Sequence, residues 1–141
     1  MIAAGIAVAV EDADPAFSTQ PVGTNITTGS TLVLTATAIG NSAVSYLWKK
    51  DGVALVNGGA ISGATSDTLT ITGVTSSDAG DYTVEATNLA GTEVSLTATV
   101  GVVNVIVTEN PVNLRALIGS TAEYSGAATS QSSLSYRWFY T

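Results

Sequence analysis

The sequence repeats itself at an offset of 90 residues. Without any gap, this offset pairs Pro21 with Pro111, Val22 with Val112, Gly29-Ser30-Thr31 with Gly119-Ser120-Thr121, Ala38 with Ala128, Ser42 with Ser132, Ser45-Tyr46 with Ser135-Tyr136, and Trp48 with Trp138. It also lays residues 2–10 on residues 92–100, where both segments alternate small or polar residues with aliphatic ones. A repeat that keeps one register over this length predicts tandem units, each the size of a small domain.

The repeat divides the chain into three parts. Residues 1–16 correspond to the last strand of a preceding unit with a linker, residues 17–101 to one complete unit, and residues 102–141 to the first three strands of another. Half of a β-sandwich cannot bury its own core. We therefore expect the native chain to continue, and the alternative is that another subunit completes the half-unit.

Within the complete unit, apolar residues alternate with polar ones, which predicts half-buried β-strands. Residues 31–38 place Leu32, Leu34 and Ala36 on one face, and the same spacing recurs in Val44, Tyr46 and Trp48. Asp51-Gly52 is a tight-turn dipeptide. Further strands are expected over residues 68–71, 82–86 and 93–100, with loops at Gly58-Gly59, Ser62–Asp67 and Asn88–Gly91. About seven short strands with regular turns predict an all-β sandwich.

Composition excludes several classes of function. The chain has no cysteine and no histidine, which removes disulfides, thiolates, imidazole bases and the usual zinc ligands. With four Lys and Arg residues and a formal net charge of −7, it lacks a basic surface for a phosphate backbone, so we expect no nucleic-acid binding. The apolar residues 2–10 are too few to cross a bilayer, so no membrane insertion is expected either.

Several motifs together resemble an I-set immunoglobulin domain. They are Trp48-Lys49-Lys50-Asp51-Gly52, Leu69-Thr70-Ile71, Asp78-Ala79-Gly80-Asp81-Tyr82, and Ala86-Thr87-Asn88 followed by Gly91. The resemblance implies an immunoglobulin-like Greek-key β-sandwich that repeats with a period of about 90 residues. It also implies that Trp48 is the core tryptophan and that the hydroxyl of Tyr82 ties a turn to the backbone.

The two cysteine positions of that family are occupied here by Ala36 and Val84, so the disulfide between the sheets is missing. The loss of such a bridge costs roughly 2–5 kcal/mol. The expected core residues are Leu34, Ala36, Trp48, Leu69, Ile71, Tyr82 and Val84. In lacking these cysteines, the unit resembles the immunoglobulin-like domains of bacteriophage virion proteins and bacterial surface proteins.

Two groups of acidic residues are open to more than one interpretation. Glu11, Asp12 and Asp14 lie at the junction between units, where their oxygens are candidate Ca²⁺ ligands; the alternative is a solvated acidic linker. Asp78 and Asp81 have the residue types of an acid–base pair, but both belong to the turn motif before Tyr82. We expect no catalytic site and no cofactor other than this candidate Ca²⁺.

Possible surface contacts lie at Leu47, Lys49, Leu89 and Ala90, positions where immunoglobulin-like domains often meet partners. Ordinary surface variation is the alternative. The expected partners are other virion or surface-protein subunits, with host-surface carbohydrate or protein as a further possibility. The sequence thus favours a non-catalytic structural or adhesive module on a virion, in a capsid or tail. The alternative is a spacer or adhesion array of a secreted bacterial surface protein.

Overall fold

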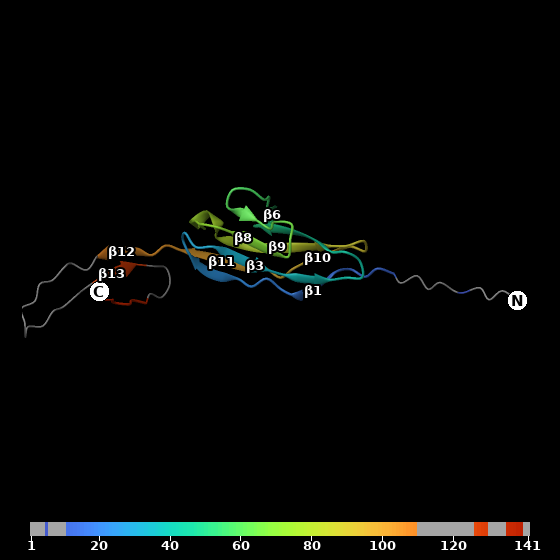
Figure 1. Ribbon diagram of the computed structural model, residues 1–141, viewed down its shortest axis with the longest axis horizontal. Coiled ribbons are helices and arrows are strands. Elements are labelled where there is room, and N and C mark those ends of the chain that lie inside the picture. Colours follow the sequence, from blue (N-terminus) through green and yellow to red (C-terminus); the bar gives the residue numbers. More distant parts are fainter. Residues whose placement is uncertain (1–4, 6–10, 110–125, 130–134, 140–141) are drawn as a thin grey trace, which may run out of the picture.

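Short strands form nearly all of the regular structure in the computed structural model, which describes residues 5, 11–109, 126–129 and 135–139 (Figure 1). A single turn of 3-10 helix, Ser76–Asp78, separates β8 from β9. The strands are β1 Ala16–Thr19, β2 Thr24–Thr27, β3 Leu32–Thr35, β4 Thr37–Ile39, β5 Ser45–Lys50, β6 Val53–Ala54, β7 Ile61–Ser62, β8 Thr68–Ile71, β9 Gly80–Thr87, β10 Thr92–Val94, β11 Ala98–Val103, β12 Ile106–Glu109 and β13 Ala127–Thr129.

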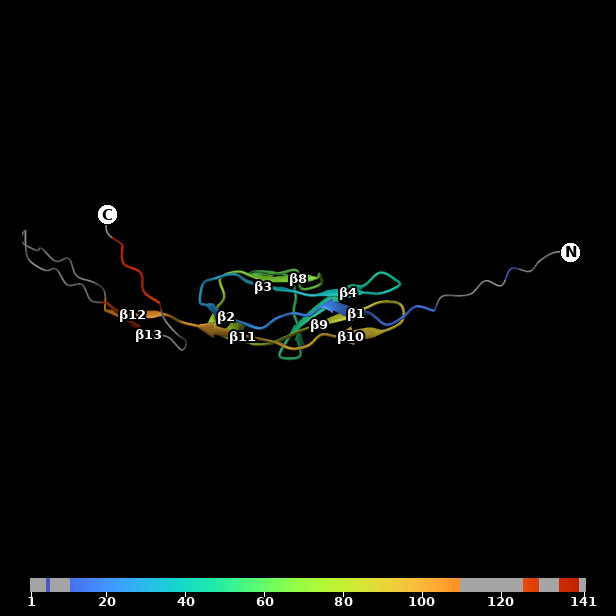
Figure 2. The ribbon, with the colours of Figure 1, turned by 90° about the horizontal axis from the view of Figure 1, so that it is seen from below.

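The strands of residues 16–103 form two layers, as the edge view in Figure 2 shows. One sheet has the order β2-β11-β9-β5-β6, with β10 also paired to β9. The other layer contains β3-β8-β7 and the pair β1-β4. All of these pairings are antiparallel except that of β2 with β11, which is parallel. This is the two-sheet arrangement expected of an immunoglobulin-like sandwich.

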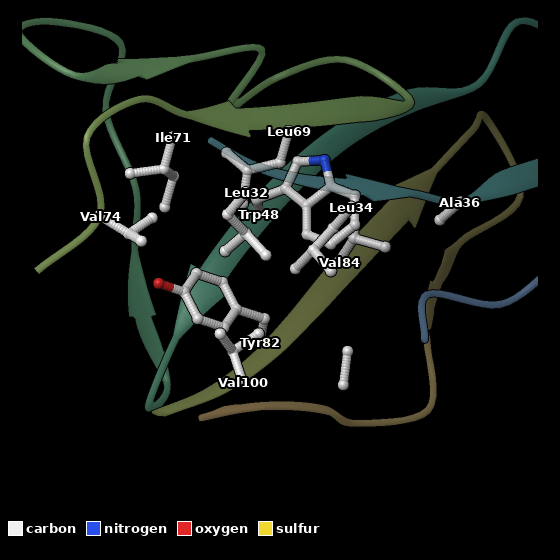
Figure 3. Close-up of a cluster of buried hydrophobic side chains, with 11 residues drawn as sticks. Leu32, Leu34, Ala36, Trp48, Leu69, Ile71, Val74, Tyr82, Val84 and Val100 are labelled. Atoms are coloured by element: carbon white, nitrogen blue, oxygen red, sulfur yellow. The ribbon is translucent and has the colours of Figure 1, made fainter. Parts of the chain in front are cut away.

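The core lies between the layers and is built mainly from inward-facing residues of β3, β5, β8, β9 and β11 (Figure 3). Trp48 is fully buried at its centre, and its indole N–H donates to the Ser66 carbonyl at 2.8 Å. Ala36 and Val84, at the two positions where the family has cysteines, are also fully buried. Packing therefore takes the place of a covalent bridge there. The core cluster consists of Leu32, Leu34, Ala36, Trp48, Leu69, Ile71, Val74, Tyr82, Val84, Ala98 and Val100.

The turn between β5 and β6 has the geometry that its dipeptide predicts. Asp51 has φ 49° and Gly52 has φ 80°, and both values lie in the left-handed region. A two-residue hairpin loop with two positive φ angles matches the right-handed twist of the strands that it joins. Asp51 pays little for this conformation because aspartate tolerates it better than most side chains do.

Three strand predictions need correction. The strand predicted over residues 31–38 is divided at Ala36, because β3 pairs with β8 whereas β4 pairs with β1. The strand predicted over residues 93–100 is divided into β10 and β11 by a one-residue shift of register against β9. Ser62, predicted as the start of a loop, belongs to the short strand β7, which pairs with β8.

Beyond β11, the chain continues through Asn104 and Val105 into β12, which pairs with β13. Tyr136 lies near this pair and its hydroxyl accepts from the Ala128 amide at 3.2 Å. Arg137 stacks over the ring of Phe139 at 5.7 Å from the ring centre. The strand predicted over residues 2–10 and most of the half-unit predicted over residues 102–141 lie outside the described residues.

Candidate functional site

The outer face of the larger sheet carries two of the predicted contact residues. The pairing of β5 with β9 places Leu47 opposite Glu85 and Lys49 opposite Thr83. The Lys49 ammonium lies 2.5 Å from the Glu85 carboxylate, and both side chains are about one-quarter exposed. Leu47 and Lys49 are therefore half-buried positions on this face.

Val94 completes a row across this face, because it lies opposite Glu85 on the other side of β9. The row thus runs from Leu47 through Glu85 to Val94, of which Val94 is 51% exposed. An ion pair this exposed adds at most about 1 kcal/mol to stability. In this row, therefore, two aliphatic side chains flank one member of an ion pair.

The carboxylates near the β5–β6 turn are committed to structural hydrogen bonds. Asp51 accepts from the Lys50 ammonium at 2.7 Å and from the Asp81 amide at 2.9 Å. The hydrogen bond from Lys50, followed by that from the Asp81 backbone, lowers the pKa of Asp51. Asp81 itself accepts from the Thr99 hydroxyl at 2.7 Å. These bonds fasten the turn to β9 and β11.

Asp78 and Asp81 do not form an acid–base pair. The Asp78 carboxylate accepts from the amide and the hydroxyl of Thr75, at 2.7 and 2.9 Å, and so closes the short helix. The Asp78 carbonyl accepts from the Tyr82 hydroxyl at 2.7 Å, which is the bond that the family resemblance implied. Burial, followed by the nearby charges of Asp78 and Asp51, raises the pKa of Tyr82 to about 12.

The acidic residues before β1 do not form a metal cluster. Within the described part of the chain, no group of three or more histidine, cysteine, aspartate or glutamate side chains is placed to hold a metal ion. Asp12 accepts a hydrogen bond from the Ser42 hydroxyl, and the Glu11 carbonyl accepts one from the Asn41 side chain at 3.5 Å. This segment is therefore attached to the β4–β5 loop.

The β9–β10 loop contacts the same segment from a second side. The Asn88 side-chain N–H donates to the Ala13 carbonyl at 2.7 Å, and its oxygen accepts from the amides of Ala90 and Gly91 at 2.9 and 3.1 Å. Leu89, 88% exposed, donates its amide to the Ser42 hydroxyl at 3.2 Å. Of the predicted contacts, Leu89 and Ala90 thus lie at this end of the sandwich, apart from Leu47 and Lys49 on the sheet.

Sequence reasoning missed the roles of Ser42 and Asn88. The signal available for Asn88 was its place three residues before Gly91 in the closing hairpin, since asparagine often bonds to backbone two or three residues ahead. Its second bond, to Ala13, joins residues far apart in the sequence and has no local signal. No helix in the described residues is long and apolar enough to cross a membrane.

Comparisons with known proteins agree with this architecture. The family model described as immunoglobulin I-set domain matches residues 15–102. An I-band fragment from titin is 28% identical with a TM-score of 0.59, over 69% of this chain and 35% of that one. The tandem Ig repeats of Dlar are 28% identical with a TM-score of 0.59, over 62% of this chain and 47% of that one.

A third structure, extracellular domains 3–5 of Drosophila OTK, is 29% identical with a TM-score of 0.57, over 62% of this chain and 31% of that chain. This chain therefore spans less than half the length of each of these three structures. The similarity covers the complete sandwich.

Proposed function

The chain belongs to the immunoglobulin I-set family, and from this premise we propose that it is a structural and adhesive module within a tandem array of such domains. The family is typically non-catalytic, and the carboxylates around Tyr82 serve structural bonds. The proposal goes further than the family by assigning the predicted half-unit of residues 102–141 to a second unit of the same kind, except that Val102 and Val103 belong to β11 of the first.

One observation carries this assignment. In the first unit, β1 pairs with β4 through Ala16 with Ile39, Phe17 with Ala38 and Thr19 with Thr37, and the register shifts between the last two pairs. In the second, β12 pairs with β13 through Ile106 with Thr129, Val107 with Ala128 and Glu109 with Ala127, with the same shift. Every residue of the second set follows its counterpart by 90 positions.

A tyrosine contact repeats with the same offset. The Tyr46 hydroxyl accepts from the Ala38 amide at 3.0 Å, and the Tyr136 hydroxyl accepts from the Ala128 amide at 3.2 Å. An irregular register and a side-chain bond that recur together support two copies of one fold, because a chance hairpin has no reason to reproduce both. The tandem repeats of Dlar are a further parallel.

The connection between the two units is short. The Thr28 amide donates to the Val103 carbonyl at 2.9 Å, so the first sandwich holds β11 to its last residue. Only Asn104 and Val105 separate Val103 from β12. A joint of this length favours units that follow one another in a line, and an extended array suits a role in display or spacing.

We further propose that the array decorates a virion, where assembly in the host cytoplasm requires no disulfide. Two features of the sequence support this setting. The chain has no cysteine, and its composition is acidic and rich in threonine and serine. The alternative setting is a bacterial surface protein, which an envelope fraction would contain and a purified particle would lack.

Mass spectrometry of the native protein tests both parts of the proposal. Purified particles and the envelope fraction of the producing cells are compared for peptides of this chain, and the intact mass is measured. The array predicts peptides of further units in which a tryptophan is followed by an Asp-x-Gly-x-Tyr motif. Absence from particles would rule out the virion setting, and a mass without further units would contradict the array.

A further inference from the structure

We propose that the β4–β5 loop and the β9–β10 loop form a docking surface for the segment Glu11–Asp14, and that this contact makes the joint before the sandwich stiff. The functional consequence of this inference rests on the proposed array, because a stiff joint would fix the direction of a preceding unit. Its evidence is independent of that array, since every contact lies within residues 11–91.

The segment is held by hydrogen bonds at three of its four residues. The Glu11 carbonyl accepts from Asn41, the Asp12 carboxylate from the Ser42 hydroxyl, and the Ala13 carbonyl from Asn88. Successive residues are thus bound by side chains of two different loops. Pro15, which follows, is buried and lacks an N–H, so the chain enters β1 with a restricted backbone.

The two loops also hold each other. The Ser42 hydroxyl donates to Asp12 and accepts from the Leu89 amide at 3.2 Å, so it connects the segment to both loops. The Asn88 oxygen meanwhile fixes the β9–β10 turn through the amides of Ala90 and Gly91. The two loops are therefore held in place by hydrogen bonds of their own, in addition to those that they make with the segment.

Two glycines allow the close approach. A Cβ atom on Gly91 would collide with the Asp14 carboxylate, and one on Gly40 would lie 2.7 Å from the Asn88 side-chain nitrogen. Neither glycine has a positive φ angle. The Asp14 carboxylate and the Asn88 nitrogen are both the ends of flexible side chains, so the two glycines favour the close approach without being essential to it.

Relaxation of backbone ¹⁵N nuclei in the full chain tests the joint. The amides of Asp12, Ala13 and Asp14 should have order parameters near those of the strands, about 0.85. Asn88→Asp keeps the oxygen that fixes the turn but removes the donor to Ala13. We expect the three order parameters to fall below about 0.6 in this variant.

Asn25→Asp is the matched control, because it adds the same charge at an exposed position in β2, which pairs with β11 away from the joint. It should leave the three amides unchanged. A second variant, Asp12→Ala, removes the bond to Ser42 without altering either loop and should also loosen the segment.

The inference is overturned if the three amides are as mobile in the wild type as in a disordered tail. It is also overturned if they stay rigid in both joint variants while the spectra show a folded sandwich. The native-mass experiment can fail independently of either result, because the order parameters report only on residues within this chain.

Discussion

At the scale of single residues, Trp48 is the largest fully buried side chain in the described part of the chain. It is fully buried in the centre of the core, and its only polar atom is satisfied by the Ser66 carbonyl. Ala36 and Val84 lie in the same cluster, at positions where a family member would have a disulfide. The packing of the indole therefore stabilises a part of the core that has no disulfide.

Trp48→Ala should lower the free energy of unfolding by about 3–5 kcal/mol, because it removes the transfer free energy of the ring and leaves a cavity. Urea unfolding measures this loss. Leu89→Ala is the control, since Leu89 is 88% exposed and its truncation should cost less than about 0.5 kcal/mol. A loss below about 1 kcal/mol for Trp48→Ala would contradict its central place in the core.

The raised pKa of Tyr82 predicts a loss of stability in alkali. The folded value is about 12, against about 10 in an unfolded chain. The folded state thus holds the phenolic proton more tightly, so its contribution is complete below about pH 10 and is lost as the pH rises toward 12. The slope in that window is at most about 1.4 kcal/mol per pH unit, the limit for one proton of difference between the two states.

Tyr82→Phe isolates this contribution. At neutral pH the variant should lose about 1 kcal/mol, because the hydrogen bond to the Asp78 carbonyl is gone. Above about pH 10 the gap between wild type and variant should close and then reverse toward pH 12, since only the wild type has a phenol at position 82 that loses its proton. Urea midpoints are measured for both proteins across this pH range. If the two midpoints decreased in parallel, the alkaline loss of stability would not come from Tyr82.

At the scale of strands, the divided elements show where sequence reasoning ends. Alternation identified the inward faces of β3, β5 and β8, because inward and outward positions along one strand depend on local pattern. It did not find the break at Ala36 or the register shift after Val94, since both depend on which strand lies alongside. The joint at Asp12, Ser42 and Asn88 was missed for the same reason.

Ser95 stabilises the shift between β10 and β11. It is a buried polar residue, whose hydroxyl accepts from the Val84 amide at 3.0 Å and donates to the Leu96 carbonyl at 2.9 Å. Ser95→Ala leaves the buried Val84 amide without that acceptor and should cost about 1–3 kcal/mol in urea unfolding. The exposed Ser18→Ala should cost less than about 0.5 kcal/mol, and equal losses would contradict a special role for Ser95.

At the scale of the whole molecule, residues 16–103 supply every strand of one closed sandwich. Among the residues that the structure describes, those of β12, β13 and 11–15 are not part of its hydrophobic core. The sandwich should therefore unfold cooperatively as one unit, without a disulfide and without help from neighbouring units.

Hydrogen exchange of the 141-residue chain, followed by mass spectrometry, tests this claim most directly. Core amides exchange only through global unfolding when a domain is self-sufficient. We predict that β3, β5, β8 and β9 exchange last and together, at the rate of global unfolding. Exchange of these strands as fast as that of an unfolded chain would contradict an independent, cysteine-free immunoglobulin domain.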